Sequence, residues 1–258
     1  MIEIRNITKS FDGRCVISDI SAVFETGKTN LIIGRSGSGK TVLLKNVIGL
    51  VTPDSGEILF DGRNLLEMNK RDILMLRREM GLLFQGSALF DSMTVLENVM
   101  FPLEMFSRKP YNERMNRAIT CLERVDLSKE SYHCYPSEIS GGMMKRAAIA
   151  RAIVLQPKYL FCDEPNSGLD PKTALIIDDL IHSISHEYEM TTVINTHDMN
   201  SVMYIGESIL FIKEGFKAWD GTKEQVTHSN NQALDDFIFA AEIHRKEKEI
   251  YKINHKES

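Results

Sequence analysis

The segment Gly34 to Thr41, with the sequence GRSGSGKT, constrains the fold of this chain more than any other feature, because it matches the pattern GxxxxGK[ST]. The run before it, Thr29 to Ile33, is short and apolar and suits a buried parallel strand. The residues after it, Val42 to Leu50, favour a helix. Since this order is strand, glycine-rich loop and helix, it predicts an α/β fold and argues against a flexible Gly-Ser linker.

This loop has the chemistry of a phosphate-binding site. Glycines let backbone N–H groups turn inward around phosphate oxygens, and the N-terminus of the following helix adds the positive end of its dipole. Lys40 would reach the β and γ phosphates, and the Thr41 hydroxyl would bind Mg²⁺. The other residues expected to bind the nucleotide are Gly34, Arg35, Ser36, Gly37, Ser38 and Gly39.

Composition excludes several other classes of protein. With 43% hydrophobic and 26% charged residues among 258, the chain is of ordinary globular composition. It has neither eighteen consecutive apolar residues nor a secretory signal at its N-terminus, and its four cysteines form no CxxC pair. A net charge of −5 disfavours a general nucleic-acid binder. We therefore expect a soluble cytoplasmic protein with no nucleic-acid partner.

An apolar run from Tyr159 to Cys162 ends in two adjacent carboxylates, Asp163 and Glu164. The carboxyl end of a parallel strand is the edge at which open α/β sheets bind ligands, and a metal ion would explain buried acids there. Asp163 is the candidate for holding Mg²⁺ and Glu164 for polarising an attacking water. The alternative is a solvated Asp-Glu turn before Pro165, which the phosphate loop makes less attractive.

A second glycine site lies at Ser140, Gly141 and Gly142, where a helix from Met143 to Leu155 is expected to begin. Ser140 is a good N-cap, and a helix start with this sequence can bind an anion. In isolation, a simple loop-to-helix cap would be the better interpretation.

Taken together, these residues resemble the ATP-binding cassette (ABC) ATPase family over about residues 1–221. Gly34 to Thr41 is similar to the Walker A loop, Tyr159 to Glu164 to the Walker B strand, and Ile139 to Met143 to the signature usually written LSGGQ. The remaining matches are the Q-loop Gln85, the D-loop Ser167 to Asp170, the switch histidine His197 and the adenine-stacking aromatic position Phe11.

Two departures from the family pattern are informative. Met143 stands where the signature usually has glutamine, and Phe11 where tyrosine is more frequent. With Met143, the signature looks like that of the ATPases of the Mla/MCE phospholipid-transport systems. This resemblance implies phospholipid as cargo. The alternatives are an ABC transporter for an amino acid, ion or drug, and an ABC ATPase without a transport role.

The resemblance also implies an architecture: a P-loop NTPase (RecA-like) core with an N-terminal antiparallel β-subdomain and an inserted α-helical subdomain. The expected domain is 1–221, with the helical insertion at about 87–155 and a C-terminal extension at 222–258. Two copies would sandwich ATP head to tail. The expected catalytic residues are Glu164, His197, Gln85 and Lys40, and the expected Mg²⁺ ligands are Thr41, Gln85 and Asp163.

Transport would also require partners, since the chain itself offers no membrane span. The resemblance implies an integral membrane permease, with MCE-domain and small STAS-type accessory proteins, and a peripheral position on the cytoplasmic face of the inner membrane. The apolar stretch Met93 to Phe106 could line the permease groove or belong to the core, and the sequence leaves both open. His182 and His186 have metal-binding spacing on an expected helix, but without a recognisable third ligand a solvated helix face is favoured.

Overall fold

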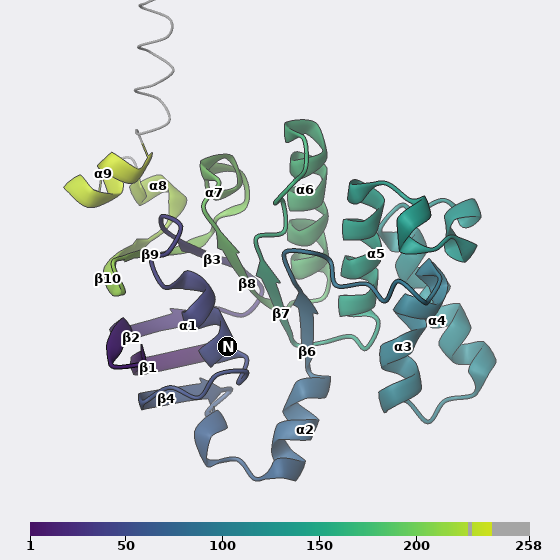
Figure 1. The fold of residues 1–258 in the computed structure, drawn as a ribbon, viewed down its shortest axis with the longest axis horizontal. Helices are drawn as coiled ribbons and strands as arrows, with labels where there is room; N and C mark the ends of the chain where they lie inside the picture. The colour runs from purple at the N-terminus through teal and green to yellow at the C-terminus, as the bar shows by residue number, and fades with distance from the viewer. Residues whose placement is uncertain (227–228, 239–258) are drawn as a thin grey trace, which may run out of the picture.

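The computed structural model describes residues 1–226 and 229–238, and they form two β-sheets and a group of helices (Figure 1). The first sheet is antiparallel, in the order β2-β1-β4-β5. Its strands are β1 (Ile2–Phe11), β2 (Arg14–Phe24), β4 (Ser55–Phe60) and β5 (Arg63–Asn64). This is the N-terminal antiparallel β-subdomain that the sequence predicted.

The second sheet has the order β10-β9-β3-β8-β7-β6 and is parallel except for the β9–β10 pair. Its strands are β3 (Thr29–Ile33), β6 (Met80–Leu83), β7 (Tyr159–Asp163), β8 (Thr191–Thr196), β9 (Ser208–Lys213) and β10 (Phe216–Gly221). All five residues of β3 are buried. Leu31 and Ile33 belong to one hydrophobic cluster and Ile32 to another, so helices or strands cover both faces of β3, as expected for an uninterrupted apolar run.

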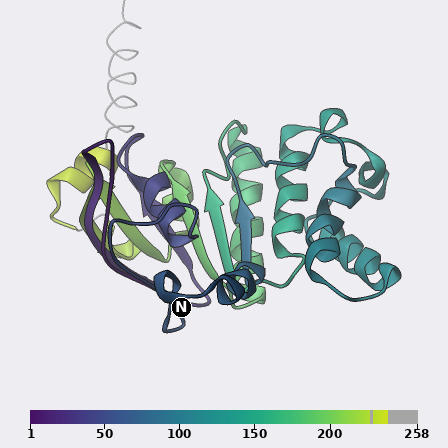
Figure 2. The same cartoon turned by 60° about the horizontal axis from the view of Figure 1, so that its bottom comes forward.

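The helices divide into two sets. One set surrounds the two sheets and consists of α1 (Lys40–Val47), α2 (Lys70–Arg78), α6 (Pro171–Glu187), α7 (Met199–Ile205), α8 (Lys223–Val226) and α9 (Gln232–Ile238). The other set packs as a separate group beyond β6 in both ribbon views (Figures 1 and 2) and consists of α3 (Val95–Phe106), α4 (Tyr111–Arg124) and α5 (Gly141–Ile153). The expected α/β architecture with an inserted helical group is therefore confirmed.

Local signals explain where several helices begin. Thr94 and Glu97 form a capping box, in which each side chain bonds to the other's backbone N–H, and α3 begins at the next residue after Thr94. Asp170 caps α6, whose first residue is Pro171. The insertion expected at about 87–155 is not helical throughout. The structure breaks it between α4 and α5, where residues 125–140 form turns and short 3₁₀ helices.

The segment after residue 221 packs on the core as far as the structure describes it. Val226 and Leu234 are fully buried, and the Phe237 ring stacks on Phe211 of β9 with 5.3 Å between centroids. The charged tail from His244 to Ser258 lies outside the described residues. Within residues 1–226 and 229–238, no helix combines the length and the apolar character that crossing a membrane requires.

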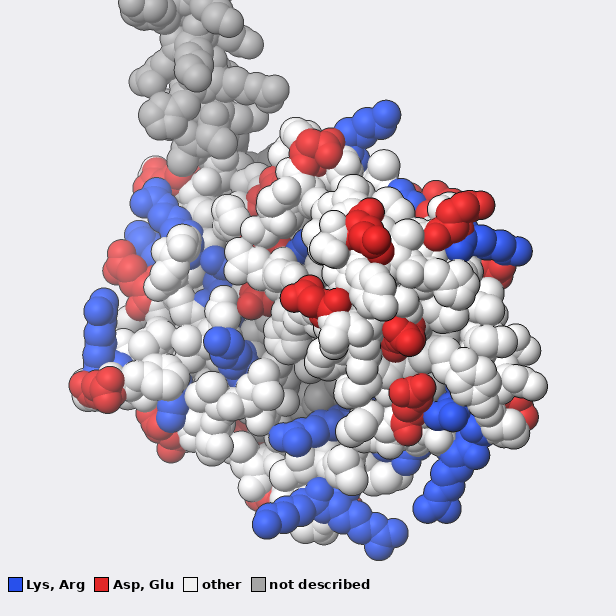
Figure 3. All heavy atoms as spheres, turned by 45° about the vertical axis from the view of Figure 1, so that its right-hand side comes forward, with Lys and Arg blue, Asp and Glu red and all other residues white. Residues whose placement is uncertain are grey.

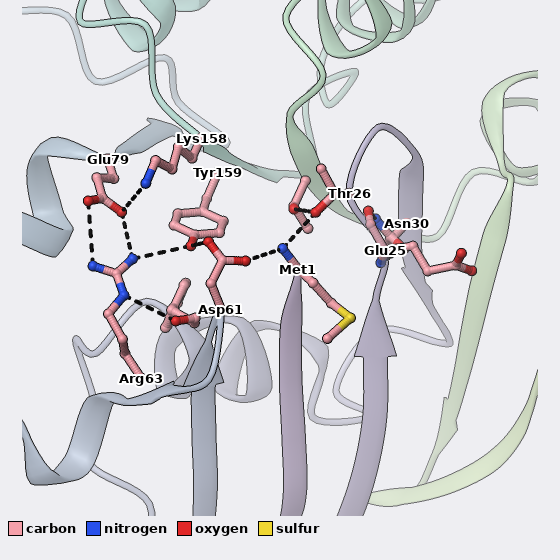
Figure 4. Close-up of polar contacts among 11 residues, drawn as sticks. Met1, Glu25, Thr26, Asn30, Asp61, Arg63, Glu79, Lys158 and Tyr159 are labelled. Atoms are coloured by element: carbon pink, nitrogen blue, oxygen red, sulfur yellow. Dashed lines mark hydrogen bonds and ion pairs between the residues drawn. The ribbon is translucent and has the colours of Figure 1, made fainter.

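A polar network joins the two sheets (Figure 4). The buried Tyr159 hydroxyl on β7 donates to Asp61 Oδ2 over 2.5 Å, and the Arg63 guanidinium donates to the Tyr159 oxygen over 3.4 Å and to Glu79 over 2.7 Å. The N-terminal ammonium of Met1 lies 2.7 Å from Asp61. Burial, followed by the hydrogen bond with Asp61, raises the pKa of Tyr159, so its hydroxyl stays a donor.

We expect Tyr159→Phe to lower the free energy of unfolding by about 1–2 kcal/mol, because it removes the hydrogen bond to Asp61 and the longer one from Arg63 and keeps the ring packing. Tyr204→Phe is the matched control, since the half-exposed Tyr204 hydroxyl donates to Asp179 over 3.2 Å. Its expected loss is below about 0.5 kcal/mol. Urea unfolding of both variants measures the difference, and equal losses would contradict a stabilising role for this network.

Candidate nucleotide-binding site

The loop Gly34 to Thr41 lies at the carboxyl end of β3 and leads into α1. Two of its glycines are required by close packing. A Cβ at Gly34 would collide with the backbone carbonyl of Ile212, and one at Gly39, where φ is 104°, would lie 2.6 Å from Ile17 Cγ2. Glycine at these two positions therefore lets the loop pass close to neighbouring strands with its backbone turned toward the site.

Lys40 is 5% exposed, and its ammonium lies under the loop. Nζ donates to the carbonyl oxygens of Gly34 at 2.8 Å and Arg35 at 3.1 Å. Burial lowers the pKa of Lys40, while the charges of Glu164 and Asp163 act in the opposite direction. The Ser38 hydroxyl is also buried and has no protein partner. A buried cation and an unpaired buried hydroxyl in one loop fit an anionic ligand such as a phosphate group.

The Thr41 hydroxyl and the Asp163 carboxylate share a hydrogen-bond donor, although 122 residues of sequence separate them. The Asn195 amide, at the end of β8, donates to Asp163 Oδ1 over 2.6 Å and to Thr41 Oγ1 over 3.3 Å. Hydroxyl and carboxylate oxygens are ligands that Mg²⁺ prefers, and the buried Asn195 Oδ1 has no partner. The residues present therefore fit a magnesium ion, and Asn195 is a member of the site that sequence reasoning missed.

Glu164 and His197 meet beside these residues. Nδ1 of His197 lies 2.8 Å from both carboxylate oxygens of Glu164, and the Glu164 N–H donates to the Asn195 carbonyl over 2.8 Å. The Glu164 side chain is 15% exposed and that of His197 63% exposed. The carboxylate is therefore fixed at one side by His197 and only partly exposed to solvent. This is an arrangement in which it could accept a proton from water.

Gln85, directly beyond β6, is connected to a different set of partners. Its side-chain amide Nε2 donates to Ser167 Oγ over 3.1 Å, and the buried ammonium of Lys145 on α5 donates to the backbone carbonyl of Gln85. Among the described residues, no hydrogen bond joins Gln85 to Thr41 or Asp163. The arrangement links the D-loop region to α5, and the proposed metal role of Gln85 stays a prediction. Lys145 had no signal in the sequence beyond its place near the signature.

The signature residues lie at the N-terminus of α5. The Ser140 hydroxyl accepts from the Met143 N–H over 3.3 Å, as expected for an N-cap, and a Cβ at Gly142 would lie 2.9 Å from Thr173. Both ribbon views place α5 on the far side of β6 and β7 from α1 (Figures 1 and 2). The two predicted anion sites therefore do not face each other within one chain.

Phe11 ends β1 and is followed by the two-residue turn Asp12-Gly13, in which both φ angles are positive. Phe11 is 43% exposed, and Lys9 Nζ lies 5.3 Å from the centroid of its ring. An exposed aromatic face is available for stacking, and its role toward adenine stays a prediction.

The fold and this site define an α/β nucleotide-binding protein with a phosphate loop. The sequence matches the family described as ABC transporter over residues 17–167, which is more than half of the chain. The protein therefore belongs to the ABC transporter family. It is an ATP-binding ATPase of a transporter, as the resemblance of its motifs predicted.

Curated relatives with different cargoes match the chain. The intermembrane phospholipid transport ATP-binding protein MlaF of Haemophilus influenzae is 35% identical over 92% of this chain and 90% of its own length. A probable ribonucleotide transport ATP-binding protein, mkl, of Mycobacterium leprae is 35% identical over 92% of this chain and 68% of its length. The methionine import protein MetN of Clostridium acetobutylicum is 40% identical over 83% of this chain and 67% of its length.

Solved structures agree with the fold. A dimeric structure of a bacterial ABC transporter cassette has a TM-score of 0.79 and 31% identity, covering 86% of this chain and 99% of that one. A post-hydrolysis dimer of the same cassette holds ADP and phosphate, with a TM-score of 0.79 and 30% identity over the same shares of both chains.

Proposed function

We propose that this protein hydrolyses ATP to power phospholipid transport through a separate integral membrane permease. The observation that carries the proposal is the share of each relative's length that this chain matches. The match to MlaF extends over 90% of that protein, whereas the matches to mkl and MetN cover about two thirds of theirs. Met143 in the signature supports the same subgroup. Amino-acid transport is the second candidate, because MetN has the higher identity.

Two copies would bind ATP between them. Since α5 and α1 lie apart in one chain, a phosphate held by the loop of one copy needs the other copy to bring its Ser140, Gly141 and Gly142. Bound ATP would then join two surfaces through shared charge, and loss of the γ-phosphate would release them. The dimeric cassettes described above support this arrangement.

In the proposed mechanism, Lys40 and the loop N–H groups orient the phosphates, and Thr41 and Asp163 would hold the metal. Bound Mg²⁺ would supply charge stabilisation of the phosphate oxygens. Glu164 accepts the proton of the attacking water, and His197 holds the carboxylate in place. Gln85, linked to Ser167 and Lys145, passes the state of the site to the helical group.

The helical group would bind the permease on the cytoplasmic face of the inner membrane, together with MCE-domain and STAS-type partners. The stretch Met93 to Phe106 has both buried and exposed apolar side chains. Met105 is 62% exposed. The buried side chains, all on α3, are Val95, Val99, Met100 and Leu103. The exposed Phe90 packs on Phe101 with 4.8 Å between ring centroids. Figure 3 shows the middle of this side as mostly uncharged, with separate acidic side chains on it and basic side chains toward its edges. We propose that Phe90 and Met105 line the docking surface.

Met105→Glu is expected to reduce co-purification of the permease by at least about 10-fold, because a charge in an apolar interface is costly. The basal ATPase rate should stay unchanged. Val23→Glu, at an exposed position on the distant strand β2, is the control. Equal permease recovery with both variants would contradict the assigned surface.

The cargo is tested on the complex of this protein with its permease, co-purified from the native membrane. We expect phospholipid, detected by mass spectrometry, and ATPase stimulation by phospholipid in nanodiscs. Stimulation by methionine with its binding protein, without bound phospholipid, would support the second candidate and overturn the first.

A further inference from the structure

His182 and His186, one turn apart near the end of α6, share a third polar group that comes from elsewhere in the chain. Glu207, directly before β9, places Oε2 3.1 Å from His186 Nε2 and 3.9 Å from His182 Nε2. The sequence showed no third ligand because 21 residues separate Glu207 from His186. One potential ligand atom from each of the three residues lies within 4.8 Å of the others.

The spacing suits a metal ion. In a tetrahedral zinc site with bonds of about 2.0–2.1 Å, neighbouring ligand atoms lie about 3.3–3.4 Å apart. The two measured separations, 3.1 and 3.9 Å, fall on either side of that value. The imidazole rings lie side by side, with 4.4 Å between centroids. Small side-chain movements would therefore bring all three ligands around one ion.

Glu207 is already held by its surroundings. Its Oε2 accepts from the N–H of Thr29 at 2.8 Å and from the Thr29 hydroxyl at 3.0 Å. Metal ligands in proteins are commonly oriented by such hydrogen bonds. The Glu207 side chain is 27% exposed, and those of His182 and His186 37% and 42%, so an ion can enter from solvent.

Charges near the cluster are mixed. Burial, His186 and Lys223 lower the pKa of His182, whereas Glu207 and Asp179 act in the opposite direction.

We propose that His182, His186 and Glu207 form a binding site for a divalent transition-metal ion, with Zn²⁺ as the expected occupant and water as its fourth ligand. The site lies at the edge of the parallel sheet where β3 and β9 begin, whereas the phosphate loop follows the other end of β3. Metal binding would connect the end of α6 to the start of β9. The proposed metal site is separate from the nucleotide site, and the proposal does not depend on the identity of the cargo.

The test is a Co²⁺ titration of the untagged full-length protein without nucleotide, followed by visible absorption and by the metal content after dialysis. We expect about one ion per chain, displaced by Zn²⁺, with d–d bands typical of nitrogen and oxygen ligands. His182→Gln, His186→Gln and Glu207→Gln should each weaken binding by at least about 10-fold. Glutamine at 207 retains an acceptor for Thr29. His133→Gln, at a histidine outside the cluster, is the control.

A second readout is thermal. Zn²⁺ at about 100 times its dissociation constant should raise the Tm of the wild type by roughly 5 °C or more, and the shift should disappear in His186→Gln. Comparing shifts rather than absolute Tm values separates metal binding from any effect of the substitution on folding. Undiminished Co²⁺ binding in the three variants, an equal loss in His133→Gln, or well under one ion per wild-type chain would overturn the proposal.

Discussion

Glu164→Gln is expected to slow ATP hydrolysis by at least about 10²-fold while leaving ATP affinity close to that of the wild type. The Glu164 carboxylate lies 2.8 Å from His197 and beside the Asp163 that would hold the metal. The amide has the same size but cannot accept a proton from water. Phosphate release, measured alongside ATP binding, separates the two effects.

The same variant tests the dimer. With hydrolysis blocked, magnesium-ATP should hold two copies together, so size-exclusion chromatography should show a dimer that is absent without nucleotide. Glu113→Gln, on the exposed face of α4, is the control and should hydrolyse ATP normally. Normal phosphate release from Glu164→Gln would remove this residue from its proposed role, and a monomer with ATP bound would contradict the sandwich.

Lys40→Ala is expected to weaken ATP binding by about 10- to 100-fold. The buried ammonium would contribute charge-assisted hydrogen bonds to the phosphates, each typically about 1.5–3 kcal/mol. The substitution also leaves the carbonyls of Gly34 and Arg35 without their donor, so the loop itself should become less ordered. Calorimetric titration with ATP in the presence of magnesium measures the change.

Lys45→Ala is the matched control, because Lys45 lies on the same helix with an exposed side chain. Its ATP affinity should stay within about twofold of the wild type. If circular dichroism shows that Lys40→Ala is folded and its ATP affinity is unchanged, the assignment of the phosphate loop is wrong.

The sequence was most informative where neighbouring residues act together. The loop at residues 34–41, the paired acids Asp163 and Glu164, and the N-cap Ser140 are short segments whose local structure follows from their own residues. The structure places all of them at strand ends or helix starts, as predicted. The resemblance to the ABC family also predicted the helical group, although it did not locate the turns and short 3₁₀ helices at 125–140.

Contacts between distant segments had no comparable signal. For Asn195, the only indication in the sequence was a polar residue at the end of a β-branched run, and for Lys145 there was none. Each nevertheless forms hydrogen bonds to segments far away in the chain.

By itself, the sequence determined the class of the protein, because phosphate binding depends on backbone conformation that a short local pattern encodes. Only the tertiary structure decided which side chains share a hydrogen bond or a ligand position. Asn195 meets Thr41, and Glu207 meets His186, because parallel strands align their ends and α6 returns along the sheet. Such contacts between distant side chains depend on strand order and register, which no single segment specifies.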